Sequence, residues 1–208
     1  PDEGKTVSIG PEQDEIPLPI LPLPIKTEFL EMDDLTADMI GTSLYDYLRQ
    51  VPDCEHNVGY AEILRDAFPH YLADLGSQIV MLDHKDVEAP YVKRKLVSLR
   101  ILLLLEPENR GLKLQLGCNY FELGLMFPEL LACRDHFTRA MRYLSDVSDD
   151  AGALNCLARI DYLLGDYPKA IERWEMLMTM VDDPALVAAI GEQVEMLREM
   201  GEPEKPLI

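Results

Sequence analysis

Apolar residues recur at intervals of three and four along most of the chain, and this spacing predicts helices. The first such stripe runs from Met39 to Leu48, follows the capping residue Thr36 and ends at Val51-Pro52. Further stripes follow, and Pro69 stands where a helix would kink or restart. No sustained alternation and no Asn-Gly or Asp-Gly hairpin turn signals a strand. The pattern predicts an all-α fold.

Residues 1–34 differ from the rest of the chain. They hold six prolines, and nine acidic residues against two lysines. Residues 16–25 are apolar throughout and rich in proline, which fixes φ and removes a backbone donor, so this run must be extended or polyproline-II. We expect it to pack into a groove on this molecule or on a neighbour, because burial removes its apolar surface from water. The alternative is a disordered apolar tail.

A repeated pattern occupies the second half. In each block a small residue at the centre of one helix is followed by a glycine, and a second helix then carries an alanine or cysteine four residues before an aromatic residue. The blocks are Lys113-x-x-Leu116-Gly117-x-x-Tyr120-x-x-x-Gly124 with Cys133-x-x-x-Phe137-x-x-Ala140, and Leu154-x-x-Leu157-Ala158 with Gly165-Asp166-Tyr167-x-x-Ala170-x-x-x-Trp174. This pattern resembles the tetratricopeptide repeat. Gly124, Gly165 and Gly201 stand as the equivalent turn glycines.

The resemblance implies an α-solenoid of antiparallel helical hairpins. We expect an extended acidic, proline-rich segment at 1–34, N-terminal helices at 35–75 and repeats over 76–200. The repeats would span about 76–109, 110–147 and 151–184, with a C-terminal capping helix at 185–200. One hairpin cannot bury its apolar face alone, so neighbouring hairpins stack and share a core.

In the tetratricopeptide family, fixed points on the first helix of each repeat face a concave peptide-binding groove. Carried onto this chain, these points are Leu114, Cys118, Phe121, Glu122, Asn155, Arg159, Tyr162, Glu195 and Arg198, joined by Leu163 and Gly191. Each could instead be a contact within the stack or a solvated residue. Leu114 and Cys118 replace the Lys and Asn of the family's carboxylate clamp, which argues against acidic C-terminal tails as ligands.

Composition narrows the classes of partner. The formal charge is −19 and the pI is near 4.4, which disfavours nucleic acid and anionic membranes. Apolar runs such as 101–105 are too short to span a bilayer. The four cysteines do not suggest a disulfide scaffold and fit reduced thiols in the cytoplasm.

No catalytic or cofactor motif is complete. Residues 4–6 (Gly-Lys-Thr) lack the earlier glycine of a P-loop, and Cys54/His56 and Cys133/His136 are at most half of a zinc site. We therefore expect no enzyme, no cofactor and no metal. The basic cluster of residues 93–95 with Arg100 either pairs with nearby acids or docks an acidic segment such as residues 1–15.

These features favour a protein–protein interaction module, a tetratricopeptide-like adaptor or chaperone. The chain is similar in size, acidity and repeat number to the bacterial type III secretion chaperones for translocator proteins. Their cargo carries Pro-x-Leu-x-x-Pro, a pattern that Pro19, Leu21 and Pro24 satisfy here. The N-terminal segment could thus act as a pseudo-ligand, in its own groove or in that of a second copy within a homo-oligomer. The alternative is a structural scaffold subunit that uses its convex face and the extra turn at 125–136.

Overall fold

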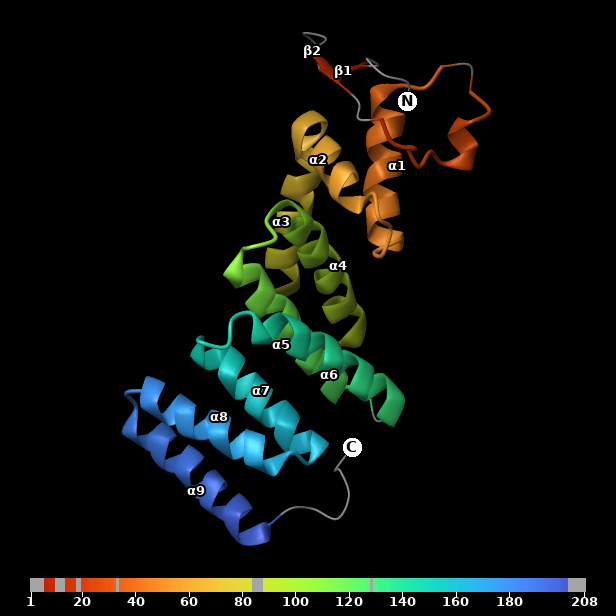
Figure 1. The fold of residues 1–208 in the computed structure, drawn as a ribbon. Helices are drawn as coiled ribbons and strands as arrows, with labels where there is room; N and C mark the ends of the chain where they lie inside the picture. The colour runs from red at the N-terminus through yellow and green to blue at the C-terminus, as the bar shows by residue number, and fades with distance from the viewer. Residues whose placement is uncertain are drawn as a thin grey trace. The chain divides into compact units, whose positions relative to one another are not determined.

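The computed structural model describes residues 6–9, 14–17, 20–32, 34–83, 88–127 and 129–201. Within these ranges the chain forms nine α-helices, one 3-10 helix and one short hairpin (Figure 1). The predicted all-α class is confirmed, since helices make up most of the backbone in those ranges. The chain divides into two compact units, Pro1–Glu108 and Asn109–Ile208. The finer domain boundaries expected from the sequence stay a prediction.

The hairpin near the N-terminus was not expected from the sequence. Strand β1 (Thr6–Ile9) pairs antiparallel with β2 (Asp14–Pro17), with Thr6 opposite Pro17 and Ile9 opposite Asp14. Thr6–Ile9 alternates polar and apolar residues, but this is the shortest run that can signal a strand, and its partner Asp14–Pro17 does not alternate. Pro17 lies at the end of its strand, where the missing backbone donor costs least. The expectation of no strand was therefore wrong for this segment.

The first unit holds a 3-10 helix, η1, and four α-helices. Their bounds are η1 (Thr27–Phe29), α1 (Ala37–Gln50), α2 (Asn57–Ala67), α3 (Pro69–Asp83) and α4 (Ala89–Leu105). Thr36 caps α1, its Oγ1 accepting a hydrogen bond from Met39 N at 3.4 Å. Helix α3 begins at Pro69, because a helix's first turn does not need the hydrogen bond that proline lacks. The predicted restart at this proline is confirmed.

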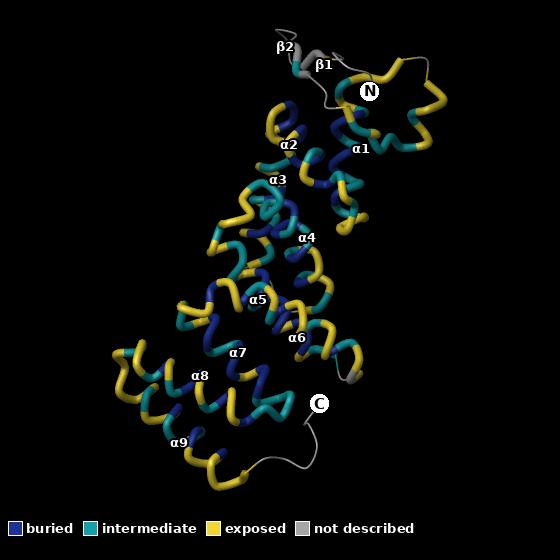
Figure 2. The backbone as a smooth tube through the Cα atoms, viewed as in Figure 1, coloured by how far each residue is buried: buried dark blue, intermediate teal, exposed yellow. Residues whose placement is uncertain are grey.

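The core of the first unit lies where α1, α2, α3 and α4 meet. Leu44, Leu64 and Leu75 are fully buried there, and Figure 2 shows buried segments of these helices in dark blue. Phe68 packs directly under Gly41, where an added Cβ would lie 2.9 Å from the ring. Helix α2 packs on α1, α3 and α4, so it is central to this unit.

The second unit consists of five helices, each preceded by a loop. Their bounds are α5 (Arg110–Leu125), α6 (Leu130–Ser145), α7 (Ala151–Leu164), α8 (Tyr167–Met180) and α9 (Pro184–Met200). Asn109, Asp150, Asp166 and Asp183 cap α5, α7, α8 and α9 by accepting hydrogen bonds from backbone N–H groups of the first turn. These caps fix where four of the five helices start.

Consecutive helices of the second unit pack side by side, α5 on α6, α6 on α7, α7 on α8 and α8 on α9 (Figure 1). In addition α5 packs on α7. Gly165 ends α7 with a φ of 82°, as a turn glycine should. Gly124 is different, because it lies inside α5 and an added Cβ would lie 2.5 Å from the Phe137 ring. Its expected role as a turn glycine was wrong, and close helix packing explains why a glycine stands there.

Candidate peptide-binding pocket

The second unit contains a pocket of about 390 Å³ among its last helices. Its walls come from the end of α5 and from α7, α8 and α9, and the lining residues are Leu125, Asn155, Arg159, Tyr162, Leu163, Trp174, Ala189, Ile190 and Gln193. Asn155, Arg159, Tyr162 and Leu163 all stand among the groove positions expected from the repeat pattern. A pocket of this size accommodates one or two large side chains of a partner.

The pocket wall is largely aromatic and aliphatic. The ring of Tyr162 stacks on that of Tyr167, with centroids 5.7 Å apart, and lies 6.1 Å from the ring system of Trp174. Trp174 is only 6% exposed, so its position is fixed by packing. Helix α9 closes the pocket with Ile190. A rigid wall of this kind can bury an apolar side chain at low entropic cost.

The polar groups of the pocket are mainly hydrogen-bond donors. Asn155 Oδ1 accepts from Trp174 Nε1 at 3.4 Å, so the acceptor of that amide is occupied and its NH₂ group is left to donate. The Arg159 guanidinium lies over the Phe121 ring, 4.8 Å from its centroid. Among the described residues Arg159 forms no ion pair. These donors suit a carbonyl or carboxylate on a bound segment.

The remaining expected groove residues lie outside the pocket lining. Phe121 is buried, 3% exposed, beneath Arg159. Cys118 on α5 lies against Cys156 on α7, with the two sulfur atoms 3.7 Å apart. Leu114 is half-buried and Glu122 is exposed. The roles of these four in ligand contact stay a prediction.

Helix α9 presents different residues to the pocket from those expected. The repeat pattern named Glu195 and Arg198, but both are exposed and they pair with each other at 2.5 Å. Arg198 also pairs with Glu175 of α8. Ala189, Ile190 and Gln193 line the pocket instead. Two positions along an α-helix correspond to a rotation of about 200° around the helix axis. A register error of two residues therefore changes which face of α9 is assigned to the pocket.

A buried ion pair joins α7 to α8 near the pocket. Asp161, 2% exposed, accepts a hydrogen bond from Arg173. Burial raises the pKa of Asp161 to about 6, against the lowering effect of the Arg173 charge. This ion pair links α7 to α8 at Asp161, the residue immediately before Tyr162.

The apolar N-terminal run packs on the first unit. We call residues 20–26 the strap. Leu21, Leu23 and Ile25 contact the core of the first unit. The Tyr60 hydroxyl donates to the carbonyl of Pro22. Pro19 of the proposed pseudo-ligand lies outside the described residues, whereas Pro24 is half-buried within the strap.

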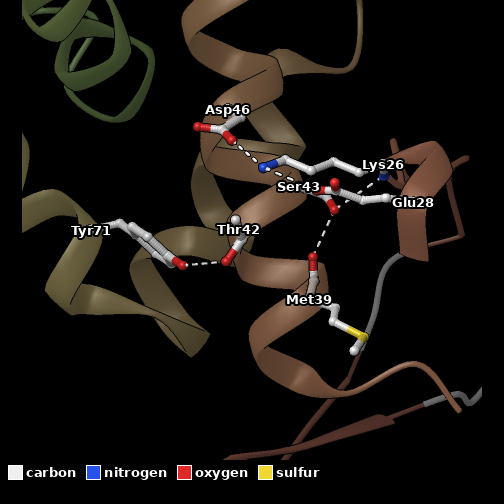
Figure 3. Close-up of polar contacts among 7 residues, drawn as sticks. All are labelled: Lys26, Glu28, Met39, Thr42, Ser43, Asp46 and Tyr71. Atoms are coloured by element: carbon white, nitrogen blue, oxygen red, sulfur yellow. Dashed lines mark hydrogen bonds and ion pairs between the residues drawn. The ribbon is translucent and has the colours of Figure 1, made fainter. Parts of the chain in front are cut away.

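Lys26 anchors the end of the strap to α1 (Figure 3). Its ammonium group lies 2.5 Å from Asp46 Oδ2, and its backbone N–H donates to Ser43 Oγ at 3.3 Å. Ser43 Oγ in turn donates to the Met39 carbonyl at 2.7 Å. These contacts keep the strap on its own unit. Occupancy of the α5–α9 pocket by this segment, in the same or another chain, stays a prediction.

Other candidate chemistry is not assembled in the described part of the chain. No group of three or more His, Cys, Asp or Glu side chains there could hold a metal ion. Of the basic cluster, Lys95 pairs with Asp83, and Arg94 lines a second, smaller pocket with Arg49. Residues 1–5 and 10–13, part of the acidic segment that could dock there, lie outside the described ranges. Over the same ranges, no helix combines the length and the hydrophobicity needed to cross a bilayer.

Comparison with known proteins adds no relative to this picture. No family model, no curated protein and no solved structure matches the chain. The functional argument therefore depends on the pocket and on the residues that build it.

Proposed function

We propose that the protein is a non-enzymatic interaction module, a tetratricopeptide-like adaptor or chaperone that holds a peptide segment of a partner protein. The observation that carries the proposal is the convergence of Asn155, Arg159 and Tyr162 on one apolar pocket. All three stand at positions that the resemblance to the tetratricopeptide repeat implies for the groove. The packing of α5 on both α6 and α7 supports a repeat-like arrangement, because first helices of successive hairpins then lie side by side.

The chemistry of the pocket indicates the kind of segment held. An apolar or aromatic side chain would insert between Tyr162, Trp174 and Ile190. A backbone carbonyl or a carboxylate beside it would accept hydrogen bonds from Arg159 and from the Asn155 amide. Buried anchors of this type carry most of the binding energy in peptide recognition.

A displayed library of random 12-residue peptides tests this proposal. Peptides selected on the whole chain should be enriched in a large apolar residue beside an acceptor. Arg159→Ala should weaken their binding at least tenfold, whereas Arg198→Ala should leave it unchanged. Both arginines stand at expected groove positions, but only Arg159 lines the pocket. Equal losses in the two variants, or no selection at all, would overturn the proposal.

A scaffold role is the second candidate, and the exposed Leu131 favours it. Its side chain is 84% exposed at the start of α6, within the extra turn at 125–136. An apolar side chain this exposed suits a permanent protein contact. Leu131→Asp should abolish self-association seen by light scattering if this turn is an assembly interface, and should not affect peptide binding in the α5–α9 pocket.

The finer assignment belongs to the same proposal. The resemblance to translocator chaperones implies a bacterial protein acting in the cytoplasm, where cysteines stay reduced. The four cysteines, all in the described ranges, form no disulfide bond here, and the described residues of the segment with the Pro-x-Leu-x-x-Pro pattern lie on the core of the first unit. A translocator-like cargo peptide should compete with library peptides if the chaperone assignment is right.

A further inference from the structure

Two of the four cysteines face each other across the α5–α7 contact. Cys118 Sγ and Cys156 Sγ are 3.7 Å apart, on helices that pack directly together. A disulfide bond needs about 2.05 Å, a difference that side-chain rotation and a small helix shift can supply. Both residues are partly exposed, whereas Cys133 is buried, and Cys54 belongs to the other unit. The pair is therefore accessible to a small reagent and already in place to close.

We propose that Cys118 and Cys156 form a reversible dithiol–disulfide site that links α5 to α7 and takes low-molecular-weight disulfides, such as oxidised glutathione, as its oxidant. The thiolate of Cys118 attacks one sulfur of the oxidant, the S–S bond breaks, and one glutathione leaves as a thiolate that takes up a proton. The thiol of Cys156 then loses its proton and attacks the Cys118 sulfur. A second glutathione leaves, so two protein thiols are oxidised and one disulfide is reduced.

The interaction between the two sulfur atoms supports this order of attack. The pKa of Cys156 is raised, first by its hydrogen bond with Cys118 and then by burial. Either sulfur atom can donate in this hydrogen bond, and when Cys156 donates its S–H, Cys118 is the thiolate that attacks the oxidant. Arg159, one helical turn from Cys156, opposes the rise and adds a positive charge beside the pair.

The site lies in line with the candidate pocket. Cys118 faces Cys156, and three residues further along each helix Phe121 faces Arg159. One more turn brings Leu125 and Tyr162, both in the pocket lining. A disulfide would fix the spacing of α5 and α7 one turn from Arg159. The linkage itself does not depend on the proposed function, although its effect on ligand binding would.

The test uses the whole reduced chain in mixtures of reduced and oxidised glutathione. Acid quenching, alkylation and peptide mapping by mass spectrometry should find a cross-link between the Cys118 and Cys156 peptides with the loss of two hydrogen atoms. This intramolecular product should exceed the mixed glutathione disulfide at least tenfold, since its second thiol is held in place. Cys118→Ser or Cys156→Ser should abolish the cross-link, and Cys54→Ser or Cys133→Ser should preserve it.

The wild-type map alone decides the proposal if a serine variant fails to fold. Stable glutathione adducts at Cys118 or Cys156 without a cross-link would overturn it. Cross-links to Cys54 or Cys133 in comparable amounts would overturn it too, because they would show indiscriminate oxidation. In the cross-linked wild type the Tm should rise by several degrees, and a reductant should reverse that rise. None of these readouts involves a peptide ligand, so failure here leaves the proposed function standing.

Discussion

The guanidinium of Arg159 lies 4.8 Å from the centroid of the Phe121 ring, so a charge from α7 covers an aromatic residue of α5. This contact does two things. The guanidinium covers an aromatic ring where α5 and α7 meet. It also holds a positive charge at the pocket of a strongly acidic protein. A lysine would carry the same charge but would not stack as a planar group on the ring.

Replacing Arg159 should cost stability as well as binding. We expect Arg159→Ala to lower the free energy of unfolding by about 0.5–1 kcal/mol, the usual size of a cation–π contact near the surface. Arg142→Ala, which removes an exposed charge from α6, should change it by less than about 0.5 kcal/mol. Urea unfolding monitored by circular dichroism measures both. Equal effects would show that the stacking contact contributes nothing.

The buried Asp161 should make stability depend on pH. Its pKa of about 6 in the folded chain lies above the ordinary 3.8, so the folded state binds the proton more tightly than the unfolded state does. Asp161 therefore destabilises the fold increasingly as pH rises through this window. Asp161→Asn removes that dependence. The free energy of unfolding of the variant minus that of the wild type should be about 2 kcal/mol larger at pH 7 than at pH 4.5.

Carboxyl NMR titration measures the same property directly. The side-chain carbon of Asp161 should titrate with a midpoint near pH 6 in the folded protein. Arg173→Gln should move the midpoint higher, because it removes the charge that opposes the effect of burial. A wild-type midpoint below 3.8 would mean that the ion pair outweighs burial.

Close packing at Gly117 should make it intolerant of a side chain. A Cβ at this position would overlap Leu144 Cγ, so Gly117→Ala should destabilise the second unit by about 1–3 kcal/mol. Gly191→Ala is the matched control, since its Cβ would lie 3.8 Å from Met178 Sδ, at ordinary contact distance. That substitution should stabilise α9 by roughly 0.5–1 kcal/mol through helix propensity. Thermal unfolding measures the Tm of both variants. A change of both Tm values in the same direction would contradict this account.

The strap should contribute to the first unit through its inward side chains only. Ile25 packs on the core of the first unit and Ile20 is exposed. Ile25→Ala should lower stability by about 1–2 kcal/mol and Ile20→Ala by less than about 0.5 kcal/mol. Removal of residues 1–34 should expose the core face of α1 and α2, seen as increased dye binding or self-association. A truncated chain with unchanged dye binding and size would show that the strap covers nothing.

Helix positions were predictable because apolar spacing reflects burial directly. Thr36 and Pro69 mark helix starts in the sequence as they do in the structure. The short hairpin was not predictable, since its pairing depends on backbone hydrogen bonds that four residues per strand do not encode in side-chain pattern. Gly124 was misassigned for a related reason: a turn and a close helix contact both demand glycine, and only coordinates separate them.

The groove residues expected on α7 line the pocket, whereas those expected on α9 do not. Helix α7 has partners on both sides in the repeat pattern, so Asn155, Arg159 and Tyr162 keep their expected face. Helix α9 is followed by no second helix in the described chain that would fix its rotation. The sequence could not identify Ile190 as a pocket residue, because an apolar residue on a capping helix is expected to belong to the core.

Trp174 offers the most direct measurement of the central claim, because it is the sole tryptophan of the chain and lines the pocket. Titration of the whole chain with a library-selected peptide should change Trp174 emission in a saturable way. The midpoint should shift at least tenfold higher in Arg159→Ala and stay unchanged in Arg198→Ala. Peptide binding that leaves Trp174 emission unaltered in the wild type would place the ligand elsewhere and contradict the account.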